Sequence, residues 1–404
     1  MNKKMLKRSL FLGALMTAVI TGNALAATEY VYGNGESITV GADKTPDANI
    51  EYRVMGGFKD YKGQEFNGNV TVNDGKWNMV VGGCYVKDSE ENFTMNIGST
   101  NVLIKDGNFT HVVGGTAASS VKNITSKEGR TAHLVIEKGT FGDKNLWQTS
   151  NVLENLVIGG DHVKNYGETQ PDNASNLHLN HAKTEIKGGT FNSLIIGGSL
   201  ANQYYPGGGS NVLITTVGTA ETIITGGTFN KAIVAGGVAM ATNAVSNVDN
   251  AILNISNATV NADIFTGGMI RHSTEDPTDK KGAHVETSVV TIKNSKVNNI
   301  YNTRGEAIRV GNDWVFSPEK VASEELDKIK VEDTDLPGVN EKYDSTKTTL
   351  TLINTTAKEV NITKGSVELR VEGKEGATSI GKLVVGNNGA TIVTASADGD
   401  ANDA

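Results

Sequence analysis

One short motif recurs along the chain, and this repetition constrains the fold more than any other feature. Residues 222–237 read TIITGGTFNKAIVAGG. Related copies occur at residues 70–83, 102–115, 184–198 and 253–268, with a longer copy at 134–160. A supersecondary unit repeated in tandem is the signature of an elongated solenoid. We therefore expect stacked coils rather than a globule around one closed core.

Each copy contains an alternating strand, a glycine turn, a phenylalanine or other apolar residue, a short apolar strand and a closing glycine pair. The apolar runs are β-branched and too short to nucleate a helix, so the pattern predicts an all-β solenoid over about residues 54–308. We expect the consensus apolar residues to fill its interior: Ile104, Val112, Ile186, Ile195, Ile223, Val234, Ile255 and Ile264.

The turn glycines have a predicted conformational role. Gly226 or Gly227 should adopt a positive φ angle, which residues other than glycine and asparagine adopt only at a steric cost. Asn257 and Asn294 occupy the corresponding position in later copies.

The spacing between closing glycine pairs varies, so insertions of different length should leave the solenoid on one side, which is often the binding side. One insertion carries the adjacent residues Tyr204 and Tyr205. Exposed tyrosines suit sugar or protein recognition, and this loop is the predicted ligand-contact surface. The alternative is that both rings fold back over the solenoid wall.

The first 26 residues resemble a secretory signal peptide. Lys3, Lys4, Lys7 and Arg8 precede an apolar run at residues 10–20, and Ala24-Leu25-Ala26 follows as a small-x-small site. We expect export through the Sec translocon, with cleavage near Ala26. The alternative is an ordinary N-terminal helix.

The charge balance disfavours nucleic-acid binding, and the single cysteine excludes a disulfide within the chain. Loss of the four positive charges of the predicted signal peptide would change the formal net charge from -8 to -12, and no basic patch is evident. This balance disfavours nucleic-acid binding. Cys84 is the sole cysteine, so it forms no disulfide within the chain, and we expect it to be a small buried or half-buried residue rather than a nucleophile.

The sequence shows no evident catalytic, cofactor or metal site. The candidate carboxylates occur singly, without an obvious pair: Asp106, Asp143, Asp161, Asp249 and Asp263. His178 and His181 should lie on opposite faces of a strand. His162 should be a solvated loop residue. We therefore expect no enzymatic activity.

The organisation changes after Trp314. We predict a repeat domain at residues 27–316, a charged linker at 317–345, a second β segment at 346–394 and a disordered tail at 395–404.

The motifs Gly188-Gly189-Thr190-Phe191 and Ile195-Ile196-Gly197-Gly198, together with the signal peptide and the acidic chain, resemble the passenger regions of bacterial autotransporters of the pertactin-like and adhesin-like kind. The resemblance covers about residues 1–315. It implies a right-handed parallel β-helix, moved across the outer membrane by a C-terminal barrel and displayed outside the cell. No run of barrel strands is evident in this chain, so a barrel would be encoded downstream, or the protein would be released or anchored otherwise.

The expected function is that of a cell-surface or secreted adhesin that binds host or community glycans or proteins. Two alternatives remain open at this point. One is a polysaccharide lyase or glycosidase on the same scaffold, and the other is a structural stalk.

Overall fold

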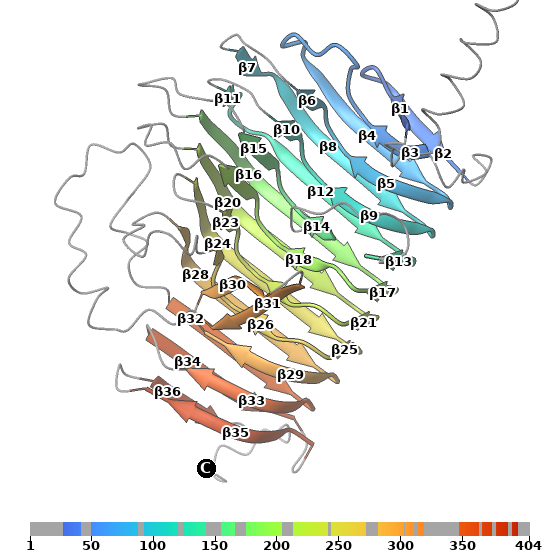
Figure 1. Cartoon of the computed structure of the whole chain (residues 1–404). Coiled ribbons are helices and arrows are strands. Elements are labelled where there is room, and N and C mark those ends of the chain that lie inside the picture. The colour runs from blue at the N-terminus through green and yellow to red at the C-terminus, as the bar shows by residue number, and fades with distance from the viewer. Residues whose placement is uncertain are drawn as a thin grey trace, which may run out of the picture.

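The computed structural model describes most of the chain as an all-β solenoid (Figure 1). The described residues are 27–41, 50–87, 93–119, 124–142, 155–165, 175–203, 213–240, 244–271, 282–302, 304–310, 313–318, 347–362, 366–373, 377–386 and 390–394. They contain no helix, and hence no helix long and apolar enough to cross a membrane. The predicted signal peptide, the tail and all but the first two residues of the predicted linker lie outside these ranges.

The strands form three sheets. The 13-stranded sheet contains β2 (Ser37–Val40), β4 (Phe66–Val72), β7 (Phe93–Met95), β8 (Ile97–Ile104), β11 (Ile124–Ser126), β12 (Thr131–Ile136), β16 (Ser175–Ile186), β20 (Leu213–Ile224), β24 (Ala244–Ser256), β28 (Ala283–Lys293), β32 (Lys347–Ile353), β34 (Ser366–Glu372) and β36 (Ala390–Thr394). The 15-stranded sheet contains β1 (Ala27–Tyr32), β3 (Ile50–Met55), β5 (Lys76–Val81), β9 (Asn108–Val113), β13 (Thr140–Phe141), β14 (Leu156–Ile158), β17 (Thr190–Phe191), β18 (Leu194–Ile196), β21 (Thr228–Phe229), β22 (Ile233–Val234), β25 (Thr259–Val260), β26 (Ile264–Phe265), β29 (Lys296–Tyr301), β33 (Thr356–Ile362) and β35 (Ser379–Val385). The 8-stranded sheet contains β6 (Tyr85–Lys87), β10 (Ala117–Ser119), β15 (His162–Asn165), β19 (Leu200–Gln203), β23 (Val238–Met240), β27 (Met269–Arg271), β30 (Gly305–Val310) and β31 (Asp313–Pro318).

One coil visits the three sheets in turn, and equivalent residues of successive coils pair. In one coil, β16 leads through a glycine turn to β17 and β18, and a glycine pair then leads to β19. Strand β16 pairs in parallel with β20, so Thr184 faces Thr222 and Ile186 faces Ile224. Only the β30–β31 hairpin is antiparallel among the described pairings. The fold is therefore the parallel β-solenoid that the repeats predict.

Six of the eight predicted interior residues lie in the main core, and a seventh, Val234, packs in a separate buried cluster on the other face of its strand; all seven are at most 1% exposed. Ile223 is the exception. It lies half-buried in β20, while its neighbours Thr222 and Ile224 point inward. Successive residues of a strand point to opposite faces, so only one of two adjacent isoleucines can point inward. Ile224 is the inward one, because it pairs with the buried residues Ile186 and Ile255 of the neighbouring coils.

A column of phenylalanines occupies one interior position. Phe109, Phe141, Phe191 and Phe229 are buried, and their ring centroids lie 5.0, 4.6 and 4.7 Å apart in that order. The parallel register that stacks the coils also stacks these rings.

The two types of glycine serve different purposes. Gly227 has a φ angle of 106°, and Asn257 and Asn294 have φ angles of 52° and 50°. The left-handed residue of this turn is therefore Gly227 and not Gly226. The closing pairs are needed for a different reason, since a Cβ atom on Gly114 would lie 2.4 Å from the carbonyl oxygen of Gly159 in the next coil.

The adjacent glycines Gly188 and Gly189 allow a matched test of the turn. Gly189 has a φ angle of 117°, and its Cβ position lies 2.7 Å from a backbone oxygen, whereas Gly188 has ordinary φ and a nearest contact at 3.3 Å. We expect Gly189→Ala to lower the free energy of unfolding by about 1–3 kcal/mol. Gly188→Ala should change it by about 0.5 kcal/mol or less. Equal effects in urea denaturation would contradict the assignment.

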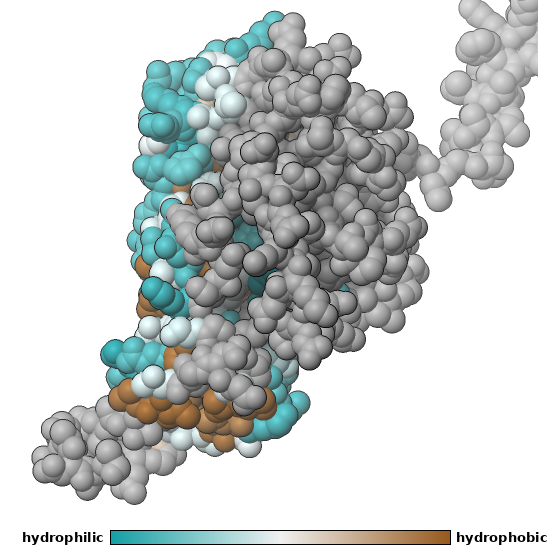
Figure 2. All heavy atoms as spheres, turned by 90° about the vertical axis from the view of Figure 1, so that its left-hand side faces the viewer, coloured by the Kyte–Doolittle hydropathy of each residue, from teal (hydrophilic) through white to brown (hydrophobic). Residues whose placement is uncertain are grey.

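The segment after the predicted linker continues the same solenoid. Strand β32 pairs with β28, and β33 pairs with β29, both in parallel. The closing glycine pair is absent here because the described part of these coils alternates between two sheets and omits the 8-stranded one. Apolar side chains are exposed on the last two strands, at the end of the solenoid (Figure 2): Leu383, Val385, Ile392 and Val393.

Candidate ligand-binding corner

The 15-stranded and 8-stranded sheets meet at a corner that faces away from the main core. Val80 belongs to the main core, whereas Val81, the next residue, packs in a second cluster together with Tyr85. Gly82 and Gly83 turn the chain between them, so the outer rows of the two sheets contact each other. The term outer corner is used for the residues that lie beside the glycine pairs on these two sheets and point away from the main core.

The middle of the outer corner is closed. Large aliphatic side chains from both sheets fill it, and Ile158, Ile196, Leu200, Val234 and Val238 are fully buried. This part behaves as a second hydrophobic core, because aliphatic side chains from both sheets cover it.

The N-terminal end of the same rows has a different composition. Tyr30, Arg53, Met79 and His111 occupy equivalent positions on β1, β3, β5 and β9, in successive registered pairs. The facing row on the 8-stranded sheet contains Tyr85, Ala117 and His162 on β6, β10 and β15. We define the N-terminal cluster as Tyr30, Tyr32, Glu51, Arg53, Tyr85, His111, His162 and Lys164. All of its members are half-buried.

Arg53 lies at the centre of one row. Its Nη1 atom donates to the hydroxyl of Tyr30 at 3.3 Å, and its Nη2 atom donates to Glu51 Oε2 at 2.7 Å. The guanidinium also lies 5.5 Å from the centre of the Tyr30 ring. The rings of Tyr30 and Tyr32 stack at 5.7 Å with an interplanar angle of 14°. The result is an aromatic surface next to a fixed cation.

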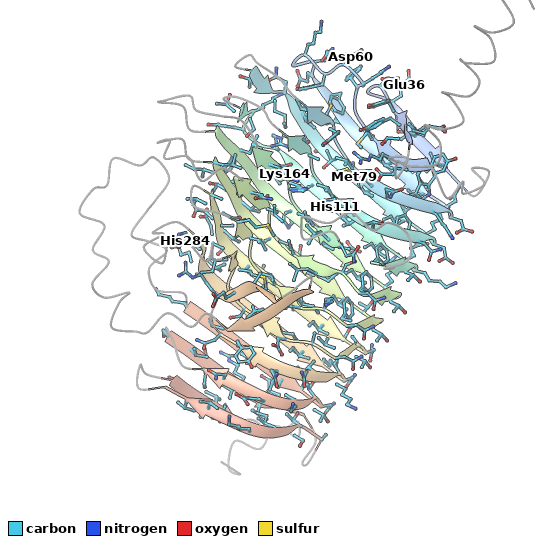
Figure 3. The ribbon with its side chains drawn as sticks, in the orientation of Figure 1. Glu36, Asp60, Met79, His111, Lys164 and His284 are labelled. Carbon is cyan, nitrogen blue, oxygen red and sulfur yellow. The ribbon has the colours of Figure 1, made fainter. Side chains whose placement is uncertain are left out.

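The two histidines join the two sheets across the corner. His111 Nε2 and His162 Nδ1 are 3.0 Å apart, and the tautomers decide which of them donates. Burial, with Arg53 and Lys164 adding to it, lowers the pKa of His111 to about 3. Burial and the neighbouring His111 and Lys164 hold the pKa of His162 well below its usual range. Figure 3 shows Met79, His111 and Lys164 near one another on this part of the solenoid.

The histidine pair predicts acid sensitivity. Unfolding would restore a histidine pKa of about 6.5. Between that value and about 3, the unfolded chain binds more protons than the folded chain, so stability should fall as the pH falls. We expect the urea midpoint to decrease from pH 7 to pH 4, and His111→Asn or His162→Asn to reduce the slope of that decrease. An unchanged slope in both variants would contradict this account.

Tyr204 and Tyr205 lie outside the described residues, so their role as a ligand-contact loop stays a prediction. The structure places their insertion between β19, which ends at Gln203, and β20, which begins at Leu213. This is the junction between the 8-stranded and 13-stranded sheets.

The prediction for His162 as a solvated loop residue is wrong. His162 begins β15, and the preceding Asp161 is 1% exposed. Asp161 accepts hydrogen bonds from Arg130 Nη1 at 2.9 Å, Arg130 Nη2 at 3.1 Å and the backbone N–H of Thr116 at 2.7 Å. Arg130 is also 1% exposed. The carboxylate therefore has a structural role, and no sequence pattern indicates its distant partner Arg130.

The prediction that His178 and His181 lie on opposite faces is also wrong. Both are half-buried in β16, while Leu179 and Ala182 point inward. The alternation shifts by one residue at the exposed Asn180, where the ladder to β20 omits a pairing, so residues three apart can share the outer face. His181 Nε2 lies 3.2 Å from Glu221 Oε2.

The other candidate carboxylates are dispersed. Asp106 pairs with Lys138 at 2.9 Å in a surface turn, and Asp263 accepts a hydrogen bond from Asn299 at 2.8 Å. Asp249 lies within β24, and Asp143 lies outside the described residues. Among the described residues, no group of three or more histidine, cysteine, aspartate or glutamate side chains could hold a metal ion.

Cys84 is fully buried and free, as expected, and burial raises the pKa of its thiol to about 12. A thiol in this environment is unreactive at neutral pH.

Sequence reasoning missed the N-terminal cluster. The available signal was a change of residue type at one repeat position, where Arg53 and His111 stand in place of the later Leu156 and Leu194. The facing position shows the same change, from His162 to Leu200.

The fold defines a protein of the parallel β-solenoid class. No family model, curated protein or solved structure matches the chain.

Proposed function

We propose that this chain is an exported binding protein, displayed at the cell surface or secreted, that holds a glycan against the N-terminal cluster. The observation that supports this proposal is the contrast along the outer corner. Its middle is closed by aliphatic side chains, while its N-terminal end offers half-exposed tyrosine rings and fixed hydrogen-bond donors. Aromatic faces beside a few oriented polar groups suit sugar rings.

Export and display rest on the sequence. The signal-peptide pattern at residues 1–26 and the resemblance to autotransporter passengers support a location outside the cytoplasm, with an outer-membrane barrel as one means of display. A row of registered strands also supplies a rigid support for side chains that contact a ligand.

Polysaccharide lyase activity is the second candidate, and the histidine pair favours it. A neutral imidazole can take a proton from a sugar carbon, and a nearby cation can stabilise the charge that develops on an adjacent carboxylate. His111 and His162 remain neutral at pH 7; the charges of Arg53 and Lys164 act on His111, and the charge of Lys164 acts on His162. Release of unsaturated oligosaccharides from uronic-acid polymers, lost in His162→Asn, would favour this activity over simple binding.

Binding is tested by titrating the purified chain with a panel of host and microbial oligosaccharides. We expect Tyr30→Ala and Tyr85→Ala each to reduce the affinity for the tightest-binding oligosaccharide at least about tenfold, equal to about 1.4 kcal/mol of binding free energy. Tyr301→Ala is the matched control, because Tyr301 occupies an outward row of the same sheet near its other end.

The outcomes separate the candidate surfaces. Loss of binding in the Tyr30 and Tyr85 variants alone supports the N-terminal cluster. Loss only in Tyr204→Ala or Tyr205→Ala would move the contact surface to the inserted loop. The absence of binding to every glycan and surface protein tested would favour the structural stalk.

A further inference from the structure

We infer that the N-terminal cluster recognises a sugar that carries a carboxylate, with the carboxylate next to Arg53 and the sugar ring against the tyrosines. This inference rests on the proposed function and names its ligand class.

The charges around the cluster favour an anion. Arg53 and Lys164 both lower the pKa of His111, so both place positive potential at the point where the two sheets meet. Lys164 also lowers the pKa of His162. A potential that disfavours a proton on an imidazole attracts a carboxylate in the same place.

The negative groups near the cluster lie on its N-terminal side. Glu51 pairs with Arg53, and Asp60 acts on Tyr32, whose pKa burial raises to about 12. Tyr32 therefore stays a neutral hydroxyl at physiological pH. Among the members of the cluster, those beyond the coil of Met79 are His111, His162 and Lys164, which include no carboxylate.

Two polar atoms of the cluster lack a hydrogen-bond partner among the described residues. They are Nε of Arg53 and Nε2 of His162, and both are buried. An unpaired buried N–H is costly, so a small movement that brings an acceptor to Arg53 Nε would be favourable, and His162 Nε2 can donate or accept depending on its tautomer. A carboxylate has two oxygens and can accept from a guanidinium and a neighbouring group together.

The tyrosines account for the sugar rather than a simple anion. Tyr30 and Tyr32 present nearly parallel rings, and Tyr85, on the 8-stranded sheet, packs against the same second cluster as they do. A sugar ring has an apolar face, which can pack against the face of a tyrosine ring. Its edge carries hydroxyls, which can hydrogen-bond to a tyrosine hydroxyl. A free inorganic anion has no such apolar face to set against the rings.

The test compares two probes that differ in charge. Oligogalacturonate and the uncharged galactan oligosaccharide of equal length are titrated into the purified chain at one salt concentration and pH 7. We expect the acidic oligosaccharide to bind at least about tenfold more tightly. Arg53→Gln should remove most of that preference, and Arg53→Lys, which keeps the charge, should retain part of it.

Arg370→Gln is the matched control. Arg370 pairs with Glu368 at 2.8 Å, two residues earlier on the same strand, as Arg53 pairs with Glu51 at 2.7 Å. We expect no change in binding from this variant. Thermal unfolding of each variant shows whether it is folded.

The results separate carboxylate recognition from glycan binding in general. Equal binding of the acidic and neutral probes in the natural chain, or an acidic preference that persists in folded Arg53→Gln, would overturn the carboxylate inference and leave glycan binding standing. Failure of the acidic and neutral probes, and of every other glycan in the panel, would overturn the proposed function as well.

Discussion

Replacement of Asp161 by alanine is expected to lower the free energy of unfolding by about 3–5 kcal/mol. Asp161 and Arg130 are each 1% exposed, and the variant would leave the guanidinium buried without its carboxylate. The backbone N–H of Thr116 would lose its acceptor as well. Urea denaturation followed by circular dichroism measures the change.

An exposed ion pair provides the control. Asp106 lies 2.9 Å from Lys138, with both side chains substantially exposed. Asp106→Ala should therefore cost less than about 1 kcal/mol. Replacement of both buried partners, as in Arg130→Met with Asp161→Leu, should recover much of the loss. A tolerated Asp161→Ala would show that water or another group reaches Arg130.

Replacement of Phe191 by alanine should lower the free energy of unfolding by about 3–5 kcal/mol. Phe191 is fully buried, and its ring stacks on Phe141 at 4.6 Å and on Phe229 at 4.7 Å. The variant would open a cavity in the middle of the column, and the paired strands on either side restrict collapse around it.

Thr190 is the matched control for this prediction. It precedes Phe191 in β17 but is exposed, so Thr190→Ala should change stability by about 0.5 kcal/mol or less. Similar losses in the two variants would show that the measurement reports on the strand and not on the ring column.

The repeats made most of the fold predictable because each copy carries its own strand, turn and closing glycines. Gly227 and Phe191 illustrate this, since their positions recur and their roles follow from one copy. Ile223 was misplaced because two adjacent isoleucines satisfy the same pattern. The choice between them depends on the register of neighbouring coils.

The candidate site was far less predictable, because its residues come from different coils. Arg53 and His111 are separated by one coil, and His111 meets His162 only through the angle between two sheets. A sequence pattern indicates which residues share a row, but not which rows meet across a corner. The partnership of Arg130 with Asp161 was missed for the same reason.

The most direct test of the central claim is a crystal structure of the chain with a bound acidic oligosaccharide. We expect ligand density at the N-terminal end of the outer corner, with a sugar ring against Tyr30 or Tyr85 and a carboxylate next to Arg53. Density confined to another face, or to the insertion that carries Tyr204 and Tyr205, would contradict it.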